Sequence, residues 1–281
     1  MTITASGFDN SSAATITWDG SALTTTPSSV TTSSTGTIPA SGTVSFTVPS
    51  GAYGGHTVQI TTGTSNIAVA TFTINTPTLA ITSPTVPAAG FPPGVTLTIT
   101  GTNLEANKTT TFLFDDASVG TATSTINGTA ELVFTVPEVN NTSTHILRVT
   151  NSAYAVASVT LVVATPSITL NPSTTAVGTQ VSITGTNFKT NSAISFFLNG
   201  TSLTTDTSVT SNGGGSFATT FTVPTAAAGS NTVKAQSSVN LYATATLTVS
   251  TPALTLTPTS GPDGLSVTAN GTGFKASSTV N

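Results

Sequence analysis

The sequence contains no cysteine and very few charged residues. Without cysteine the chain cannot form disulfides, use a thiol nucleophile or bind a metal through thiolates. Charged residues make up 5% of the chain, whereas ordinary soluble domains contain about 25%. Only five residues are Lys or Arg and the net charge is −4, so no basic surface can follow a phosphate backbone. We therefore expect no nucleic-acid partner.

Long apolar runs and helical periodicity are also missing. No stretch of about 18 apolar residues is present, so we expect no membrane span in this segment. Aromatic residues make up only 6% of the chain. A surface with so few charges must consist of Thr, Ser, Asn and Gly. Hydroxyl groups or attached sugars would then have to hold water at that surface.

What the sequence does contain is an internal repeat. Residues 76–81 recur as 165–170 and 251–256, with their prolines 89 and 86 positions apart. A second marker, a Val-Pro pair, recurs with nearly the same spacing at 48–49, 136–137 and 223–224. A unit of this length can bury a core of its own. We predict immunoglobulin-like domains over 1–76 (leading strand missing), 77–164 and 165–250, and the start of a fourth repeat or a donor segment over 251–281.

Short segments rich in Thr and Val alternate apolar and polar residues within each repeat. Residues 95–99, Val-Thr-Leu-Thr-Ile, place one face on a core and the other in water. Asp19-Gly20 and Asn199-Gly200 favour tight hairpin turns, because Gly and Asn accept a positive φ. These patterns predict an all-β fold, a tandem array of immunoglobulin-like β-sandwiches with about seven strands each.

The front of each repeat carries a more specific pattern. Residues 254–264 hold a strand and a proline-then-glycine loop, and residues 267–274 end in Gly-Thr-Gly-Phe. The matching endings are Gly-Thr-Asn-Phe at 185–188, Gly-Thr-Asn-Leu at 101–104 and a degraded Ala-Ser-Gly-Phe at 5–8. This pattern resembles the IPT/TIG family of immunoglobulin-like domains in prokaryotic cell-surface and extracellular proteins. The resemblance covers only the front of each repeat, and it implies a fold and an extracellular setting but no activity.

The residues that could carry chemistry are few and scattered. His56 and His145 occupy one position of the repeat, where the third copy has Asn231. Histidines in separate domains at a replaceable position do not converge as a catalytic site requires. Asp115 and Asp116 could join a weak Ca²⁺ site or form a solvated turn. We predict no enzyme activity, no cofactor and no metal.

Asparagine sequons are the most plausible sites of modification. Each begins Asn-X-Ser/Thr without an intervening proline. Sugars there would supply the hydration that charges do not, so we predict covalent glycans. The candidates are Asn10, Asn107, Asn127, Asn140, Asn141, Asn199 and Asn270.

The two ends of the sequence are out of phase with the repeat. Residues 1–4 align with the second strand of a repeat, and the last residues stop just after the same point in the fourth copy. One explanation is a segment of a longer array. The other is strand donation, in which Leu254, Thr255, Leu256 and Thr257 complete the first domain of the next copy. Such head-to-tail contact predicts self-association into a filament or layer.

These features together predict a structural, extracellular or cell-surface repeat protein that forms a stalk, a surface layer or a filament. One alternative is an adhesin that binds glycans or another cell, which exposed aromatics clustered at one pole would favour. A second alternative is the spacer region of a large secreted enzyme.

Overall fold

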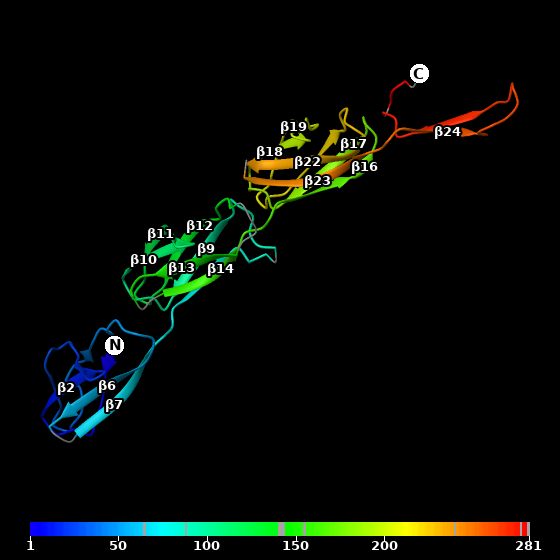
Figure 1. Ribbon diagram of the computed structural model, residues 1–281. Helices are drawn as coiled ribbons and strands as arrows, with labels where there is room; N and C mark the ends of the chain where they lie inside the picture. Colours follow the sequence, from blue (N-terminus) through cyan, green and yellow to red (C-terminus); the bar gives the residue numbers. More distant parts are fainter. Residues whose placement is uncertain are drawn as a thin grey trace.

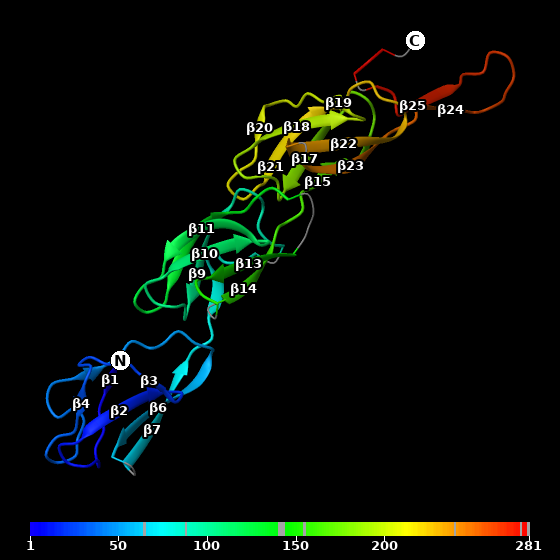
Figure 2. The ribbon, with the colours of Figure 1, turned by 60° about the vertical axis from the view of Figure 1, so that its left-hand side comes forward.

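The alternating segments form strands, which are the only regular elements among the described residues. A computed structural model describes residues 1–63, 66–87, 89–139, 144–153, 156–238, 240–275 and 277–279. Three β-sandwiches follow one another along an extended line, and a hairpin projects from the last of them (Figures 1 and 2). The predicted all-β array of immunoglobulin-like sandwiches is confirmed.

The second sandwich contains the complete repeat. Its two sheets have the strand orders β12-β9-β8 and β11-β10-β13-β14, and all their ladders are antiparallel. In β9 the predicted alternation buries Leu97 and Ile99 completely. A bridge from Phe91 to Val163 ties the segment before β9 to the other sheet. The strands are β8 Thr78–Ser83, β9 Thr96–Thr102, β10 Thr109–Phe114, β11 Ala117–Thr123, β12 Ala130–Thr135, β13 Thr144–Thr150 and β14 Val156–Val162.

The third sandwich repeats this plan with additional short strands. Its sheets have the orders β15-β17-β21 and β16-β23-β22-β18-β19, and β20 pairs with β18. Strand β16 runs parallel to β23, in the place of the Phe91–Val163 bridge. The strands are β15 Ser167–Asn171, β16 Thr174–Thr175, β17 Gln180–Thr186, β18 Ala193–Leu198, β19 Thr201–Ser202, β20 Val209–Thr210, β21 Phe217–Thr222, β22 Gly229–Ser238 and β23 Leu241–Val249.

The first sandwich has no counterpart of β8 or β15 among the described residues. One sheet contains only β1 and β5, and the other has the order β3-β2-β6-β7 with β4 beside β2. Strand β1 occupies the repeat position of β9 and β17, and its side away from β5 has no partner strand among the described residues. The strands are β1 Thr2–Ile3, β2 Ala13–Trp18, β3 Ser21–Ala22, β4 Val30–Thr31, β5 Val44–Ser45, β6 Gly54–Thr62 and β7 Asn66–Ile74.

Each sandwich has its own hydrophobic cluster. No disulfide ties these cores together, because the chain has no cysteine. Their large members are Trp18 and Phe46 in the first, Phe91 and Phe112 in the second, and Phe188 and Phe221 in the third. The clusters lie inside the predicted ranges 1–76, 77–164 and 165–250, and the boundaries of those ranges stay predictions.

The terminal hairpin repeats the first hairpin of the preceding sandwiches. Strand β24, Ala253–Thr257, pairs with β25, Thr268–Thr272, and every residue of both strands is exposed. Leu254 lies opposite Gly271, as Leu79 lies opposite Gly101 and Ile168 opposite Gly185. The hairpin therefore has the strand register of a repeat but no sandwich around it.

Candidate functional site

A His–Asp pair closes the end of one hairpin in each of the first two sandwiches. His56 Nδ1 lies 2.7 Å from Asp19 Oδ2, and the Thr57 amide donates to Asp19 Oδ1 at 2.8 Å. In the second sandwich His145 Nδ1 lies 2.6 Å from Asp115 Oδ2. Both aspartates have a positive φ, which turns their carboxylates back toward the next strand. We call this arrangement the hairpin bracket.

Two amides build the same bracket in the third sandwich. Asn199 Nδ2 donates to Asn231 Oδ1 at 2.8 Å. Asn231 Nδ2 donates to the Ala227 carbonyl at 2.9 Å, and His56 Nε2 lies 2.7 Å from the carbonyl of Ala52 at the matching position. The bracket can thus be built without a titratable group. This geometry agrees with the interpretation of the histidines as one replaceable structural position.

The hydrogen bonds of the bracket shift the pKa values of its members. The hydrogen bond from His56 lowers the pKa of Asp19, and the same bond raises the pKa of His56. The hydrogen bond from His145 lowers the pKa of Asp115. The charged form of the first bracket, an ionised Asp19 beside a protonated His56, is therefore favoured at mildly acidic pH.

The remaining carboxylates of the second sandwich are dispersed. Asp116 Oδ1 lies 2.7 Å from an Arg148 guanidinium nitrogen. The Thr100 hydroxyl donates to Glu131 at 3.2 Å. Among the described residues, no three Asp, Glu or His side chains gather where they could hold a metal ion. The Ca²⁺ hypothesis for Asp115 and Asp116 therefore has no supporting ligand set in the described part of the chain.

An ion pair connects the second and third sandwiches. Glu138 follows the Val-Pro marker, and its Oε1 lies 2.7 Å from Lys189 Nζ. The Ser238 hydroxyl donates to Glu138 Oε2 at 2.8 Å, and the Thr190 amide donates to the Pro93 carbonyl at 3.0 Å. The hydrogen bond from Lys189, followed by that from Ser238, lowers the pKa of Glu138. Both sandwiches therefore contribute side chains and backbone to this joint.

The motif asparagine holds the linker of each joint. Asn187 Nδ2 donates to the carbonyl of Thr165 at 3.0 Å, and Asn103 Nδ2 donates to the carbonyl of Thr76 at 3.0 Å. Both asparagines have a positive φ, and Gly273 takes the same conformation in the fourth copy. Asn and Gly tolerate this backbone region best. This contact was not predicted from the sequence, although Gly-Thr-Asn recurs in two of the repeats.

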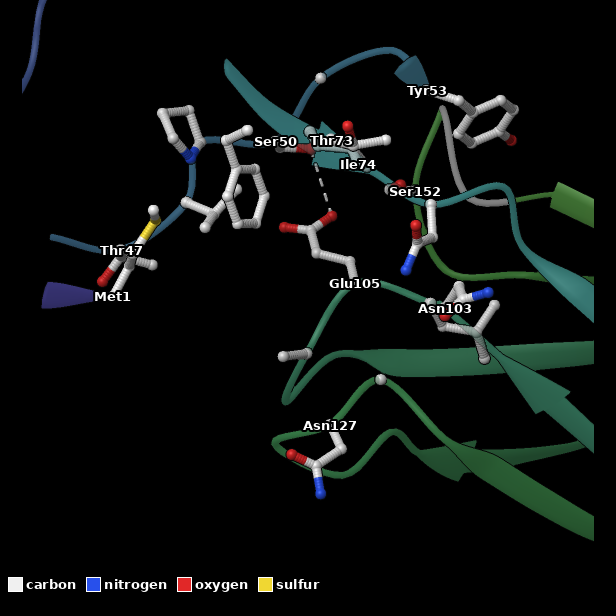
Figure 3. A pocket seen from close by; sticks show the side chains of 18 of the residues that line it. Met1, Thr47, Ser50, Tyr53, Thr73, Ile74, Asn103, Glu105, Asn127 and Ser152 are labelled. Atoms are coloured by element: carbon white, nitrogen blue, oxygen red, sulfur yellow. Dashed lines mark hydrogen bonds between the residues drawn. The ribbon is translucent and has the colours of Figure 1, made fainter. Parts of the chain in front are cut away.

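The joint between the first and second sandwiches is drawn in Figure 3. A hollow of about 500 Å³ lies between them. The Ser50 hydroxyl donates to Glu105 Oε2 at 3.4 Å, drawn as a dashed line in Figure 3. The Val156 amide donates to the Tyr53 hydroxyl at 3.3 Å. This joint has hydrogen bonds but, among the described residues, no ion pair across it.

Both joints use the same two positions of the repeat. The first follows the Val-Pro marker, and it holds Ser50, Glu138 and Thr225 in successive copies. The second follows the apolar residue of the motif, and it holds Asp9, Glu105, Lys189 and Lys275. The repeat aligns these positions, but only the structure shows that they meet across a joint. These two side chains thus decide whether a joint contains an ion pair or a hydroxyl–carboxylate hydrogen bond.

The described sequons are all exposed. They are Asn10, Asn107, Asn127, Asn199 and Asn270. Asn127 lines the hollow of the first joint (Figure 3). Asn199 belongs to the bracket, so a sugar on its nitrogen would disturb the bond to Asn231. Asn140 and Asn141 lie outside the described residues, and modification of all seven stays a prediction.

Among the described residues, the exposed tyrosines do not gather at one place. Tyr53 belongs to the first sandwich and Tyr242 to the third. Lys234 Nζ lies 5.2 Å from the ring centre of Tyr242 and 5.0 Å from that of Phe197. A lysine therefore already lies over both rings, and this arrangement does not favour the adhesin alternative.

No protein-family model matches the chain, and no curated protein sequence matches it. Among solved structures, the chain is similar to SGBP-B of the Bacteroides ovatus mixed-linkage glucan utilization locus, at 15% identity and a TM-score of 0.28, over 94% of this chain and 68% of that one. A tandem of titin domains I9–I11 is 10% identical with a TM-score of 0.35, over 89% and 93%. A β-glycosidase from Bacteroides vulgatus is 12% identical with a TM-score of 0.26, over 62% of this chain.

The chain spans 25% of the length of that β-glycosidase. With TM-scores this low, the fold assignment rests on the chain's own sheets. No helix that is long and apolar enough to cross a membrane occurs among the described residues.

Proposed function

We propose that this chain is a structural repeat protein of the cell surface or extracellular space. Its IPT/TIG-like sandwiches form part of a stalk, a surface layer or a filament. The observation that supports this most is the joint between the second and third sandwiches, where Glu138 meets Lys189 at 2.7 Å and Asn187 holds the linker at Thr165. Because such contacts restrict the angle between neighbours, each repeat adds length.

The exposed sequons support a second part of the proposal. Glycans on Asn10, Asn107, Asn127 and Asn270 would hydrate a surface that has few charges. The proposal contains no catalytic step, because the histidines brace hairpins in separate sandwiches. Mass spectrometry of native material tests the glycans, and bare peptide masses at all four sites would refute this part.

Small-angle X-ray scattering of the purified chain tests the array. A compact globule of 281 residues would have a radius of gyration of about 19 Å. We expect a value well above this and an elongated distance distribution. A radius near that of the globule would contradict the proposed function, because the sandwiches would then be folded against one another.

Two variants test whether the joint contacts restrict the angle. Asn187→Gly combined with Glu138→Gln removes the linker bond and the ion pair and leaves both cores untouched. A four-residue Gly-Ser insertion between Thr165 and Pro166 provides a deliberately loose joint. We expect the double variant to broaden the distance distribution toward that of the insertion. An unchanged distribution in both variants would show that the natural joint is already free.

A further inference from the structure

One loop recurs in all three sandwiches, ahead of the strands β5, β12 and β21. In each copy a polar side chain accepts hydrogen bonds from backbone amides further along the loop. The Ser33 hydroxyl accepts from the amides of Thr35 and Thr37, at 3.1 Å each. The Thr125 hydroxyl accepts from the amide of Thr129 at 3.1 Å. A hydroxyl at this position is therefore sufficient to hold the loop.

The third sandwich has a carboxamide at the same position. Asn212 Oδ1 accepts from the Gly214 amide at 2.9 Å and from the Ser216 amide at 3.0 Å. The next residue is Gly213, whereas the first two copies have a residue with a side chain there. Of the three copies, the third alone combines a side-chain amide with an uncrowded backbone nitrogen directly after it.

The two backbone amides polarise the side-chain carbonyl of Asn212. Hydrogen bonds to Oδ1 draw electron density from Cγ and stabilise the negative charge that forms on Oδ1 when a nucleophile adds to Cγ. The nearby nucleophile is the nitrogen of Gly213, whose amide donates no backbone hydrogen bond within the described part of the chain. A Cβ placed on Gly213 would meet nothing within 4 Å, so this position is open to water.

We propose that Asn212 is a site of succinimide formation and deamidation. The Gly213 nitrogen gives its proton to water or hydroxide and forms a bond to Cγ. The intermediate then expels Nδ2, which takes up a proton from solvent and leaves as ammonia. Water opens the resulting succinimide ring at one of its two carbonyls, and the product is aspartate or isoaspartate. The reaction consumes water and needs no other reactant.

Two other Asn-Gly pairs inside the sandwiches are held in ways that oppose this reaction. The bracket holds both ends of the Asn199 carboxamide, because Oδ1 accepts from a backbone amide of β22 and Nδ2 donates to Asn231, each at 2.8 Å. At Asn127 the attacking nitrogen is held instead, because the Gly128 amide donates to the Thr125 carbonyl at 2.9 Å. The same dipeptide should therefore react at different rates within one chain.

The reaction would change a loop that lies at the second joint. A Cβ placed on Gly215 would lie 3.1 Å from the Pro92 side chain of the preceding sandwich. The neighbouring Ser211 hydroxyl donates to the carbonyl of Lys189, whose side chain pairs with Glu138 across the joint. Deamidation adds a negative charge to this loop, and isoaspartate also lengthens its backbone. The product therefore adjoins the contacts that connect the two sandwiches.

Peptide mapping by mass spectrometry tests the proposal on the intact chain, incubated in heavy-oxygen water at mildly alkaline pH. Asn212 should lose ammonia and then gain one labelled oxygen, which distinguishes the product from deamidation before the incubation. We expect Asn212 to react at least about tenfold faster than Asn199, where two hydrogen bonds must break first. Asn212 should also react at least as fast as it does in an unstructured peptide of residues 207–219.

Two results would overturn the proposal. One is slower labelling of Asn212 in the folded chain than in the free peptide, because the loop would then protect the amide rather than activate it. The other is an equal rate at Asn212 and Asn199 in the folded chain, because the hydrogen bonds of the two side chains would then have no influence on the reaction.

Two variants separate the reaction from the stability of the loop. Asn212→Ser introduces the side chain that holds the loop of the first sandwich, so it should keep the melting temperature and remove the labelled product at this position. Gly213→Ile introduces the residue that the second sandwich has as Ile126, and it should slow labelling severalfold, because the branched side chain crowds the attacking nitrogen. An unchanged rate in Gly213→Ile would show that this nitrogen is not the nucleophile and would overturn the proposal.

Discussion

Replacing Asn231 with alanine should destabilise the third sandwich far more than a typical surface substitution. Asn231 is 3% exposed at the start of β22. Its amide nitrogen donates to the carbonyls of Ala227 at 2.9 Å and Gly229 at 3.0 Å, and its oxygen accepts from Asn199 at 2.8 Å. Alanine removes all three hydrogen bonds and leaves their partners without an acceptor or donor from this side chain.

The expected cost follows from these three bonds. Each contributes about 0.5–1.5 kcal/mol net, and partners left unsatisfied in a buried place raise the loss. We therefore expect the free energy of unfolding of the third sandwich to fall by about 2–4 kcal/mol. For a domain of this size, that change lowers the melting temperature by at least about 10 °C.

Hydrogen exchange of the full chain, followed by mass spectrometry, measures the effect sandwich by sandwich. Amides of β22 and β23 should exchange on the order of a hundredfold faster in Asn231→Ala. Amides of β13 and β14, in the second sandwich, should not change. A loss below about 0.5 kcal/mol, or an equal acceleration in the second sandwich, would refute the reasoning.

A second variant rebuilds the bracket with different chemistry. Asn199→Asp combined with Asn231→His introduces the pair that the first sandwich uses at Asp19 and His56. We expect it to recover most of the lost stability at mildly acidic pH. If it were as unstable as Asn231→Ala at that pH, the brackets would not be equivalent.

Three further predictions concern the bracket, a buried hydroxyl and the joint. Because the pKa of Asp19 is lowered in the folded protein, its carboxylate stabilises the fold, and this stability is lost as the pH falls through the lowered pKa. Because the pKa of His56 is raised, its protonated imidazole stabilises the fold, and this stability is lost as the pH rises through the raised pKa. Thermal melts followed by the single tryptophan should therefore show a maximum between about pH 4 and 6.5, and Asp19→Asn/His56→Asn should flatten this profile. Ser124 is 2% exposed and donates to a backbone carbonyl at 2.6 Å, so Ser124→Ala should cost about 1–3 kcal/mol in calorimetry, and Ser124→Thr should cost less. Lys189→Met should raise the pKa of Glu138 toward its ordinary value in an NMR titration and cost no more than about 1 kcal/mol, because the pair is partly exposed.

Local patterns were sufficient to predict the fold. Alternation in residues 95–99 predicted β9, whose Leu97 and Ile99 are buried. Asp19-Gly20 and Asn199-Gly200 predicted hairpins, and both pairs have the positive φ values of tight turns between paired strands. These signals depend on neighbouring residues alone, which is why a single sequence was enough.

The joints and brackets could not be derived in the same way. Glu138 and Lys189 are distant in sequence, and no local pattern states that they meet. One member of the hairpin bracket could be identified from the sequence, because the aligned repeats have His56 in one copy and Asn231 in another. The aligned change from Asp19 to Asn199 would have identified the side chain that forms a hydrogen bond with this position. Side-chain contacts between sandwiches depend on the angle of the joint, which follows from packing rather than from strand periodicity.

The few charges of the chain distinguish its two joints. Lys189 pairs with Glu138 across the second joint, whereas the first joint relies on the longer hydrogen bond from Ser50 to Glu105. Salt screens a partly exposed ion pair but leaves apolar cores intact. Raising the salt concentration should therefore loosen the second joint before it weakens any sandwich. At low salt the ion-paired joint should therefore be the stiffer of the two.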